Sequence, residues 1–305
     1  MRNYNYTKVN AFTWNGSLGN PAAFLELGEE QLTEAEMLAV AKEHKGFVSE
    51  FVFVTKSDKA DVKLTYYSSE CEVDFCGHGT IATMHQLISH KPWLKIKPVV
   101  KIEPNRKGCL DVINNVDRDD TVLITAPDGK MMTMNIAIDK IAKALEIEIE
   151  DIDTFVLATP IYFNHVSGTM KMVESGLRTL IVPIKTLEKE ITIFPNEQNL
   201  KSFAIEHDFD NVLIFSKETA SPKAFAHTRV FAPRFGYLED PATGSSNSAF
   251  GYYAHWLHWW PGTPILIEQG NINMLYNAVN LQIQQGKVMF GGTSKMTISG
   301  TYYII

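Results

Sequence analysis

Glu50 has the clearest capacity for chemistry, because it is a lone carboxylate in the otherwise apolar run of residues 47–54 (FVSEFVFV). The alternation of a strand places Val48 and Val52 on the face of Glu50 and the phenylalanines on the other face. A carboxyl group on a buried face loses hydration, so we expect a raised pKa and a group that exchanges protons near neutrality. A strand-end carboxylate or a structural ion pair is the alternative that this pattern leaves open.

Two short motifs place glycine at the start of a predicted helix. The first is the CGHGT segment at 76–80, and the second is the DPATGS segment at 240–245. Glycine lets a ligand approach the backbone closely, and the free N–H groups of a helix start bind anions. Two such helix starts facing each other would hold a small carboxylate from both sides. For each motif alone, an ordinary helix start is the favoured interpretation.

Composition and motif content exclude several classes of function. The chain has 305 residues and a net charge of -7, whereas nucleic-acid-binding domains are usually strongly basic. Three cysteines are too few for a disulfide framework, and the first residues lack a signal peptide, which predicts a cytoplasmic protein. The longest uncharged run, 249–267, contains glycine, proline and histidine, and we interpret it as core and not as a membrane span.

Nucleotide and metal chemistry find no support in the sequence. The chain has no P-loop, dinucleotide-binding fingerprint or H-E-x-x-H motif. His255 and His258 are spaced like a metal pair, but no third ligand accompanies them, so an aromatic core helix is favoured. We therefore expect neither a metal nor a cofactor.

The elements that position these residues follow from capping, alternation and turn signals. A capping box at Thr33 predicts a helix over 33–45, and a second helix is expected over 136–145. Strands are predicted at 62–68, 99–103, 109–113 and 121–126. The Pro-Asp-Gly turn at 127–129 suggests two domains, 1–127 and 128–305, with a last segment that can pack back on the first. A strand, a glycine-containing turn and a helical run recur in each half.

Several motifs together are similar to the PhzF-like family, named for the phenazine-biosynthesis isomerase. They occur in the family's order over about four fifths of the chain. They are VNAFT at 9–13, GNPAA at 19–23, SEFVFV at 49–54, EVDFCGHGT at 72–80, RVFAP at 229–233 and EDPATGS at 239–245. The resemblance implies an α+β fold of two pseudo-symmetric diaminopimelate-epimerase-like domains, each a β-barrel-like sheet around a central helix, with the active site between them.

The resemblance also implies roles for individual residues. Glu50 would be the general acid/base, with His78 and Asp240 beside the substrate. The implied substrate-binding residues are Asn20, Gly77, Gly79, Gly244 and Ser245. In the phenazine enzyme the glutamate moves a proton between ring carbons of a dihydro-hydroxyanthranilate, without metal or cofactor. A homodimer and a small carboxylate-bearing substrate are expected here as well.

Racemases of the same fold exchange the α-proton with two thiols, one on each side of the substrate. Cys76 lies where the first thiol would be, but the second motif offers Pro241 and Ala242 and no cysteine. Cys109 lies in a predicted hairpin and cannot easily replace it. The sequence therefore favours the carboxylate as proton carrier.

Two segments depart from the family pattern, at 66–69 and at 271–276. They leave the substrate open more than the reaction type. They also keep an alternative in view, a catalytically silent small-molecule-binding or interaction protein that retains the fold.

Overall fold

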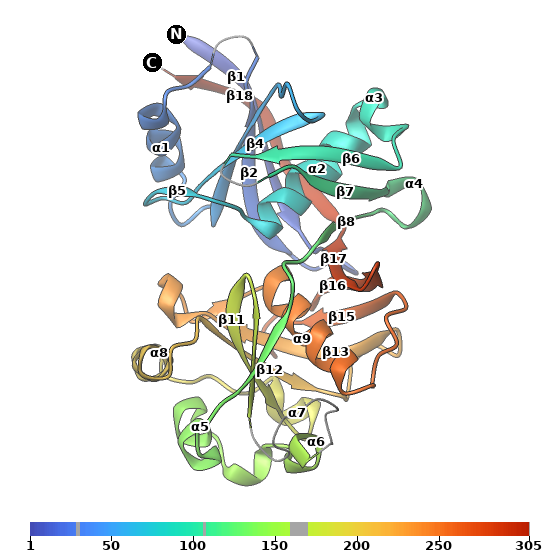
Figure 1. Cartoon of the computed structure of the whole chain (residues 1–305). Helices are drawn as coiled ribbons and strands as arrows, with labels where there is room; N and C mark the ends of the chain where they lie inside the picture. The colour runs from blue at the N-terminus through green and yellow to red at the C-terminus, as the bar shows by residue number, and fades with distance from the viewer. Residues whose placement is uncertain (29–30, 106–107, 159–169, 305) are drawn as a thin grey trace. The chain divides into compact units, whose positions relative to one another are not determined.

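The computed structural model describes residues 1–28, 31–105, 108–158 and 170–304. The chain forms two compact units, which are treated separately below (Figure 1). Unit 1 comprises Met1–Thr125 and Gly291–Ile305, and unit 2 comprises Ala126–Phe290. Unit 2 is therefore continuous in sequence, whereas unit 1 is completed by a segment that follows unit 2.

Unit 1 is a mixed sheet with a central helix. Its elements are β1 (Arg2–Ala11), β2 (Asn20–Glu26), α1 (Glu34–Glu43), β3 (Glu50–Thr55), β4 (Val62–Tyr67), β5 (Glu72–Val73), α2 (Gly77–His90), α3 (Pro92–Lys95), β6 (Val99–Pro104), β7 (Leu110–Asn115), α4 (Val116–Asp119), β8 (Thr121–Thr125) and β18 (Ser294–Ile304). Strand β1 lies between β18 and β2, antiparallel to both, and β2 continues into a parallel pair with β3. Strand β4 pairs antiparallel with β3 and β5 and parallel with β6, which continues through β7 to β8.

Unit 2 repeats this plan. Its elements are β9 (Lys130–Thr133), α5 (Ile138–Leu145), η1 (Ile149–Asp151), α6 (Thr154–Ala158), β10 (Lys171–Ser175), β11 (Leu177–Pro183), α7 (Leu187–Glu190), α8 (Glu197–Glu206), β12 (Asn211–Ser216), β13 (Ala224–Phe231), η2 (Pro233–Phe235), β14 (Glu239–Asp240), α9 (Gly244–Trp256), β15 (Ile265–Gln269) and β16 (Asn277–Gln284). Strand β17 (Lys287–Gly292) runs from unit 2 into unit 1. Strands β9 to β16 pair with the same neighbours and directions as β18 and β1 to β7 do in unit 1.

Each sheet curves around one helix that is buried on nearly all sides. Helix α2 contacts β1, β2, β3, β8 and β18, and α9 contacts β10, β11, β12 and β16. Residues 79–88 of α2 and 246–254 of α9 are buried. A helix apolar or small around its whole circumference belongs inside a domain, which explains their small residues and lack of charges. The expected α+β fold of two similar domains is confirmed.

The outer faces of the sheets are covered by other helices. In unit 1, Phe51 and Phe53 of β3 join Ala23 and Leu25 of β2 in a buried cluster beneath α1. Helix α1 begins at Glu34 with Thr33 as its N-cap and the full capping box, as the sequence predicts. In unit 2, α5 and α8 contribute buried side chains to a cluster with β10, β11 and β12.

The strand that carries Glu50 is shorter than predicted. Strand β3 begins at Glu50 and not at Phe47, since residues 46–49 form a turn and a bend. Alternation therefore does not extend back to Val48, which packs with the Phe51 cluster and not on the Glu50 face. The prediction for Val48 was wrong because glycine at position 46, with φ of 79°, reverses the chain there.

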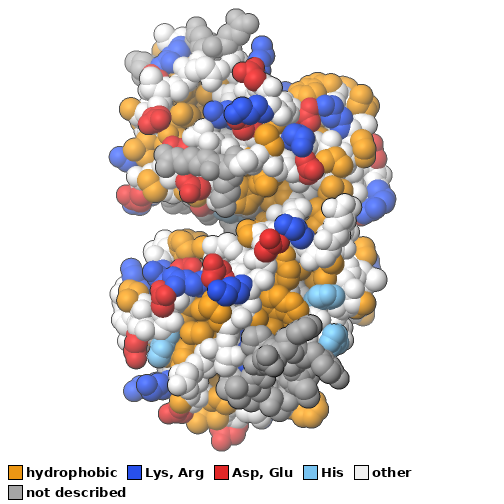
Figure 2. All heavy atoms as spheres, in the orientation of Figure 1, with side chains coloured by type: hydrophobic (Ala, Val, Ile, Leu, Met, Phe, Trp, Pro, Cys, Tyr) orange, Lys and Arg blue, Asp and Glu red, His pale blue; other side chains and the backbone are white. Residues whose placement is uncertain are grey.

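On the face visible in Figure 2, acidic and basic side chains are intermixed on each unit. No helix among the described residues is long and apolar enough to cross a membrane. The uncharged run at 249–267 is not one helix: it begins in α9, where residues 249–254 are buried, and ends in β15.

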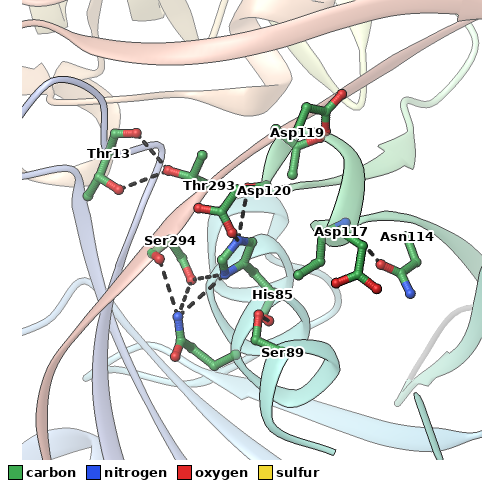
Figure 3. Close-up of polar contacts among 12 residues, drawn as sticks. Thr13, His85, Ser89, Asn114, Asp117, Asp119, Asp120, Thr293 and Ser294 are labelled. Carbon is green, nitrogen blue, oxygen red and sulfur yellow. Dashed lines mark hydrogen bonds and ion pairs between the residues drawn. The ribbon is translucent and has the colours of Figure 1, made fainter. Parts of the chain in front are cut away.

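A buried polar network fastens β18 to α2 within unit 1 (Figure 3). The Nδ1 of His85 lies 3.1 Å from the Ser294 hydroxyl, and its Nε2 lies 3.0 Å from a carboxylate oxygen of Asp120. The Gln86 amide donates to the same Ser294 hydroxyl at 2.9 Å. Although serine, histidine and aspartate meet here, Ser294 is only 8% exposed and His85 only 3%, so the group is a satisfied structural network.

Replacing Ser294 by alanine is expected to lower the free energy of unfolding by about 1–3 kcal/mol. The change removes the hydroxyl that Gln86 and His85 use as a partner, and buried polar groups left unpaired cost about this much. Urea denaturation measures the loss. Ser299→Ala, on the exposed part of the same strand, is the control and should stay within about 0.5 kcal/mol of the parent chain. Equal effects of the two substitutions would contradict the role of the network.

Candidate active site

The first glycine motif and the Glu50 strand meet at the N-terminus of α2. Glu50 is the first residue of β3, and its Oε2 lies 3.1 Å from the Nε2 of His78, in the first turn of α2. The side chains are partly shielded, with 22% of Glu50 and 13% of His78 exposed. A carboxylate is favoured beside a helix N-terminus, where the backbone N–H groups carry partial positive charge.

Cys76 completes this cluster as the N-cap of α2. Its sulfur lies 3.3 Å from the Nδ1 of His78 and accepts a hydrogen bond from the Gly79 N–H at 3.3 Å. The sulfur also lies within 4.8 Å of a Glu50 carboxylate oxygen. Cys76 is buried and unpaired by disulfide. The sequence placed Cys76 in the site but gave no indication that it contacts both Glu50 and His78.

The electrostatics of the cluster correct one prediction. Burial raises the pKa of Glu50, but the charge of His78 and the adjacent polar groups of His78 and Cys76 outweigh burial, so the pKa lies below its ordinary value. Burial lowers the pKa of His78, but Cys76 and Glu50 raise it well above its ordinary value. The expected rise for Glu50 was therefore wrong, because the partners of the carboxylate lie on α2, far from it in sequence.

The Cys76 thiol is uncharged near neutral pH, unlike Glu50 and His78. Burial and the adjacent Glu50 carboxylate raise its pKa, so the sulfur keeps its proton near neutral pH. The resting cluster is thus an ionised Glu50, a protonated His78 and a neutral thiol. In this state Glu50 has the protonation of a base.

The facing atoms of Glu50 and His78 retain capacity for a further partner. Among the described residues, neither Oε2 of Glu50 nor Nε2 of His78 has a hydrogen bond of good geometry, although both atoms are buried. A buried polar atom without a hydrogen bond is uncommon in a folded protein, and a catalytic role is one explanation for it. A substrate atom that reaches them would complete their hydrogen bonding.

Gly79 allows β3 to approach α2 closely enough for this contact. A Cβ at Gly79 would lie 3.1 Å from a methyl group of Val52 and 3.2 Å from the Cys76 sulfur. Val52 therefore shares the Glu50 face and points to α2, as alternation predicts. Asn20, the first residue of β2, is buried beside this region, with Oδ1 3.5 Å from the Ser49 hydroxyl.

Glu50, Cys76 and His78 could each offer one metal ligand, since their donor atoms lie within 4.8 Å of one another. The thiol faces Nδ1 of His78, however, whereas the carboxylate faces Nε2. One metal ion binds a single ring nitrogen, so it would have to break one of these contacts. The contacts therefore favour a cluster of polar side chains centred on His78 over a metal site.

The second motif forms the N-terminus of α9 in unit 2. Thr243 is the N-cap, and its hydroxyl donates to Oδ2 of Asp240 at 2.5 Å. The Asp240 carbonyl accepts from the Gln269 amide at 2.7 Å, which ties β14 to β15. Gly244 and Ser245 are the first two residues of the helix.

Replacing Gly244 by alanine is expected to destabilise the chain by about 1–3 kcal/mol. A Cβ there would lie 2.2 Å from the ring of Phe290, and such overpacking of a filled core costs about this amount. Thermal or urea unfolding measures it. Gly300→Ala is the matched control, because a Cβ at that strand position meets nothing within 4 Å. A neutral Gly244→Ala would contradict the tight contact.

The repeated topology identifies the counterpart of each site residue in unit 2. The parallel register pairs Glu50 with Ala22 and Asn211 with Thr179, each at the start of a six-residue strand. Asn211 therefore occupies the Glu50 position, and Thr243 occupies that of Cys76. Asn211 donates to the Ser246 hydroxyl at 3.0 Å within unit 2. An amide cannot act as the base that a carboxylate provides, so only unit 1 carries one at this position.

The structure thus places five of the predicted residues, with Cys76, in unit 1, and the other three in unit 2. The unit 1 set is Asn20, Glu50, Gly77, His78 and Gly79, and the unit 2 set is Asp240, Gly244 and Ser245. Sequence reasoning missed Thr243 and Asn211. Threonine before glycine at a helix start was an available signal for the first, whereas Asn211 emerges only from the strand register.

A family model and several curated relatives match this chain over nearly all of its length. The family model described as phenazine biosynthesis-like protein, PhzC-PhzF, matches residues 9–301. A Bacillus subtilis protein described as the uncharacterized isomerase YfhB is 30% identical over 99% of this chain and 96% of its own length. A Schizosaccharomyces pombe protein named antisense-enhancing sequence 1 is 25% identical over the full length of both chains.

Solved structures also superpose on nearly the full length of this chain. The Bacillus anthracis phenazine biosynthesis protein of the PhzF family superposes with a TM-score of 0.83 at 25% identity, over 100% of both chains. A hydroxyproline epimerase from Agrobacterium vitis superposes with a TM-score of 0.59 at 12% identity, over 99% of this chain and 91% of the epimerase. The second likeness concerns the fold alone.

Proposed function

Because this chain belongs to the PhzC-PhzF family and is an isomerase, we propose that it moves a proton on a small carboxylate substrate, with Glu50 as the general acid/base. The observation that carries the proposal is the Glu50–His78 contact at the N-terminus of α2. Both facing atoms are buried and lack a well-formed hydrogen bond. Such atoms are ready to engage a substrate.

The proton transfer has two balanced steps. The ionised Glu50 takes a proton from a substrate carbon, so that a C–H bond breaks and an O–H bond forms. The same O–H then returns the proton to a second carbon, which restores the carboxylate. While Glu50 holds the proton, the deprotonated substrate carries the negative charge, and the protonated His78 stabilises that charge. These steps need neither a metal nor a cofactor, since the electron pair stays within the substrate.

The asymmetry between the units supports a single carrier. Two-base racemases need a proton-transferring group on each side of the substrate. Here the counterpart of Glu50 is Asn211 and the counterpart of Cys76 is Thr243, neither of which is a base at neutral pH. Within unit 2, Asp240 is proposed as a further catalytic residue, and Gly244 and Ser245 as substrate-binding residues.

Solvent isotope incorporation tests the proposal. Carboxylated metabolites are screened by thermal shift, together with a dihydro-hydroxyanthranilate, and each ligand is incubated with the chain in D₂O. Turnover should place deuterium at the substrate carbon that receives the proton. The extent of labelling depends on how often the proton on Glu50 exchanges with solvent before it is returned. Ligands that bind tightly but never exchange or isomerise would contradict acid/base catalysis and favour a silent binding protein.

A further inference from the structure

Cys76 is the member of the unit 1 cluster to which the proposed reaction gives no role. It is buried, it is the N-cap of α2, and its sulfur contacts both groups of the proposed acid/base pair. Cysteine is not among the preferred N-cap residues, which are serine, threonine, aspartate and asparagine. Capping alone therefore does not account for this choice of residue.

The Cys76 sulfur is in direct contact with the helix start and with His78. It accepts from the Gly79 N–H and, with His78 protonated, from its Nδ1–H, both at 3.3 Å. The donor atoms of Cys76, His78 and Glu50 all lie within 4.8 Å of one another. The thiol proton, which neither of the two contacts uses, is therefore available to the Glu50 carboxylate.

Unit 2 has a different arrangement at its own helix start. Thr243 is the N-cap of α9, and its hydroxyl donates at 2.5 Å to the carboxylate of Asp240, three residues earlier in the chain. Asn211 holds the Glu50 position in unit 2 and donates to the Ser246 hydroxyl instead. Among the described residues, the contact of an N-cap sulfur with an imidazole beside a strand carboxylate therefore belongs to unit 1.

We propose that Cys76 is a positioning residue that holds the Glu50 carboxylate against His78 and sets the pH range in which the pair is competent. The inference rests on the proposed function, because it concerns the pair that would transfer the proton. Cys76 itself does not react with substrate. Its S–H donates to the carboxylate, and its sulfur lone pair accepts from the imidazole.

The titratable groups around the pair are few. Glu50 comes from β3, and Cys76 and His78 come from the start of α2. Tyr66 of β4 interacts electrostatically with Cys76, and its hydroxyl contacts that of Thr80 at 2.7 Å. Asp74, on the connection between β5 and α2, is exposed. Burial holds the pKa of Tyr66 far above neutrality, so Tyr66 stays uncharged across the working range.

Removal of the Cys76 sulfur should displace each limb of the pH profile in a defined direction. A donor to a carboxylate stabilises the ionised form, so its removal raises the pKa of Glu50 and moves the acid limb upward. An acceptor for an imidazolium N–H stabilises the protonated form, so its removal lowers the pKa of His78 and moves the basic limb downward. The profile of the exchange rate should therefore narrow from both sides.

The experiment compares Cys76→Ala, Cys76→Gly and Cys76→Ser in the full chain. Glycine is tolerated as an N-cap and serine is preferred there, so at least these two variants should retain α2. The His78 imidazole is titrated by NMR without substrate, and the deuterium exchange of a dihydro-hydroxyanthranilate, or of the carboxylate that the screen returns, is measured against pH. We expect His78 to titrate at lower pH in the alanine and glycine variants, kcat to fall more than KM rises, and serine to restore both.

Unchanged His78 titration and unchanged pH limbs in the alanine and glycine variants would overturn the proposal, as would a serine variant that behaves like alanine. The substrate-free titration separates this failure from that of the proposed function. If Glu50→Gln leaves exchange intact, the acid/base assignment is wrong whatever the Cys76 variants show.

Discussion

Replacing Glu50 by glutamine is expected to reduce deuterium incorporation into the substrate by about 10²–10⁴-fold, the usual contribution of a general acid/base. Glutamine keeps the size and polarity of the side chain but neither takes nor returns a proton. The cap, the glycine contact and the strand register around position 50 do not depend on the charge. The variant should therefore fold, and its loss should appear in kcat more than in binding.

A matched carboxylate provides the control. Glu103 lies on β6 of the same unit and accepts a hydrogen bond from Ser57 at 2.6 Å, away from α2. Glu103→Gln should exchange deuterium at the parent rate. In Glu50→Gln, the pKa of His78 should also fall, because the carboxylate that raises it is gone. Undiminished exchange in a folded Glu50→Gln chain would sink the assignment.

Arg229→Ala should have the largest effect on stability, a loss of about 3–5 kcal/mol in the free energy of unfolding. Arg229 on β13 is fully buried and forms a bidentate ion pair with Glu239, at 2.8 and 3.0 Å. It also donates to the Glu190 carbonyl at 2.7 Å. The substitution leaves a largely buried carboxylate without its cation, which costs far more than the pair itself contributes.

Urea denaturation measures this loss, with Arg118→Ala as control. Arg118 forms an exposed pair with Asp119, and such pairs contribute at most about 1 kcal/mol. The double variant Arg229→Met with Glu239→Gln removes both charges and should recover part of the stability. An Arg229→Ala chain as stable as the Arg118→Ala chain would contradict the role given to the buried pair.

Local signals in the sequence predict the helices well. The capping box at Thr33 placed the start of α1 correctly, because its hydrogen bonds lie within four residues. Glycine motifs marked the starts of α2 and α9 for the same reason. The second predicted helix begins at Ile138 and not at 136, which is within the range over which helix ends vary.

Properties that depend on distant partners were harder to predict. The pKa of Glu50 is shifted downward and not upward as predicted, because His78 and Cys76 approach the carboxylate from another element. Likewise, the counterpart role of Asn211 is visible only once β11 and β12 are paired. The domain boundary, the homodimer, the cytoplasmic location and the roles of the site residues stay predictions, since a single chain without ligand does not test them.

The pairing of β1 with β18 has a consequence for biosynthesis. Residues 2–11 and 294–304 lie side by side in one sheet, although all of unit 2 separates them along the chain. During translation, unit 2 is therefore complete while unit 1 still lacks an entire strand and the Ser294 anchor of α2. Domains usually fold in the order of their synthesis, but here the unit that begins first must finish last. Unit 1, which carries Glu50, can therefore complete its sheet only after β18 has left the ribosome.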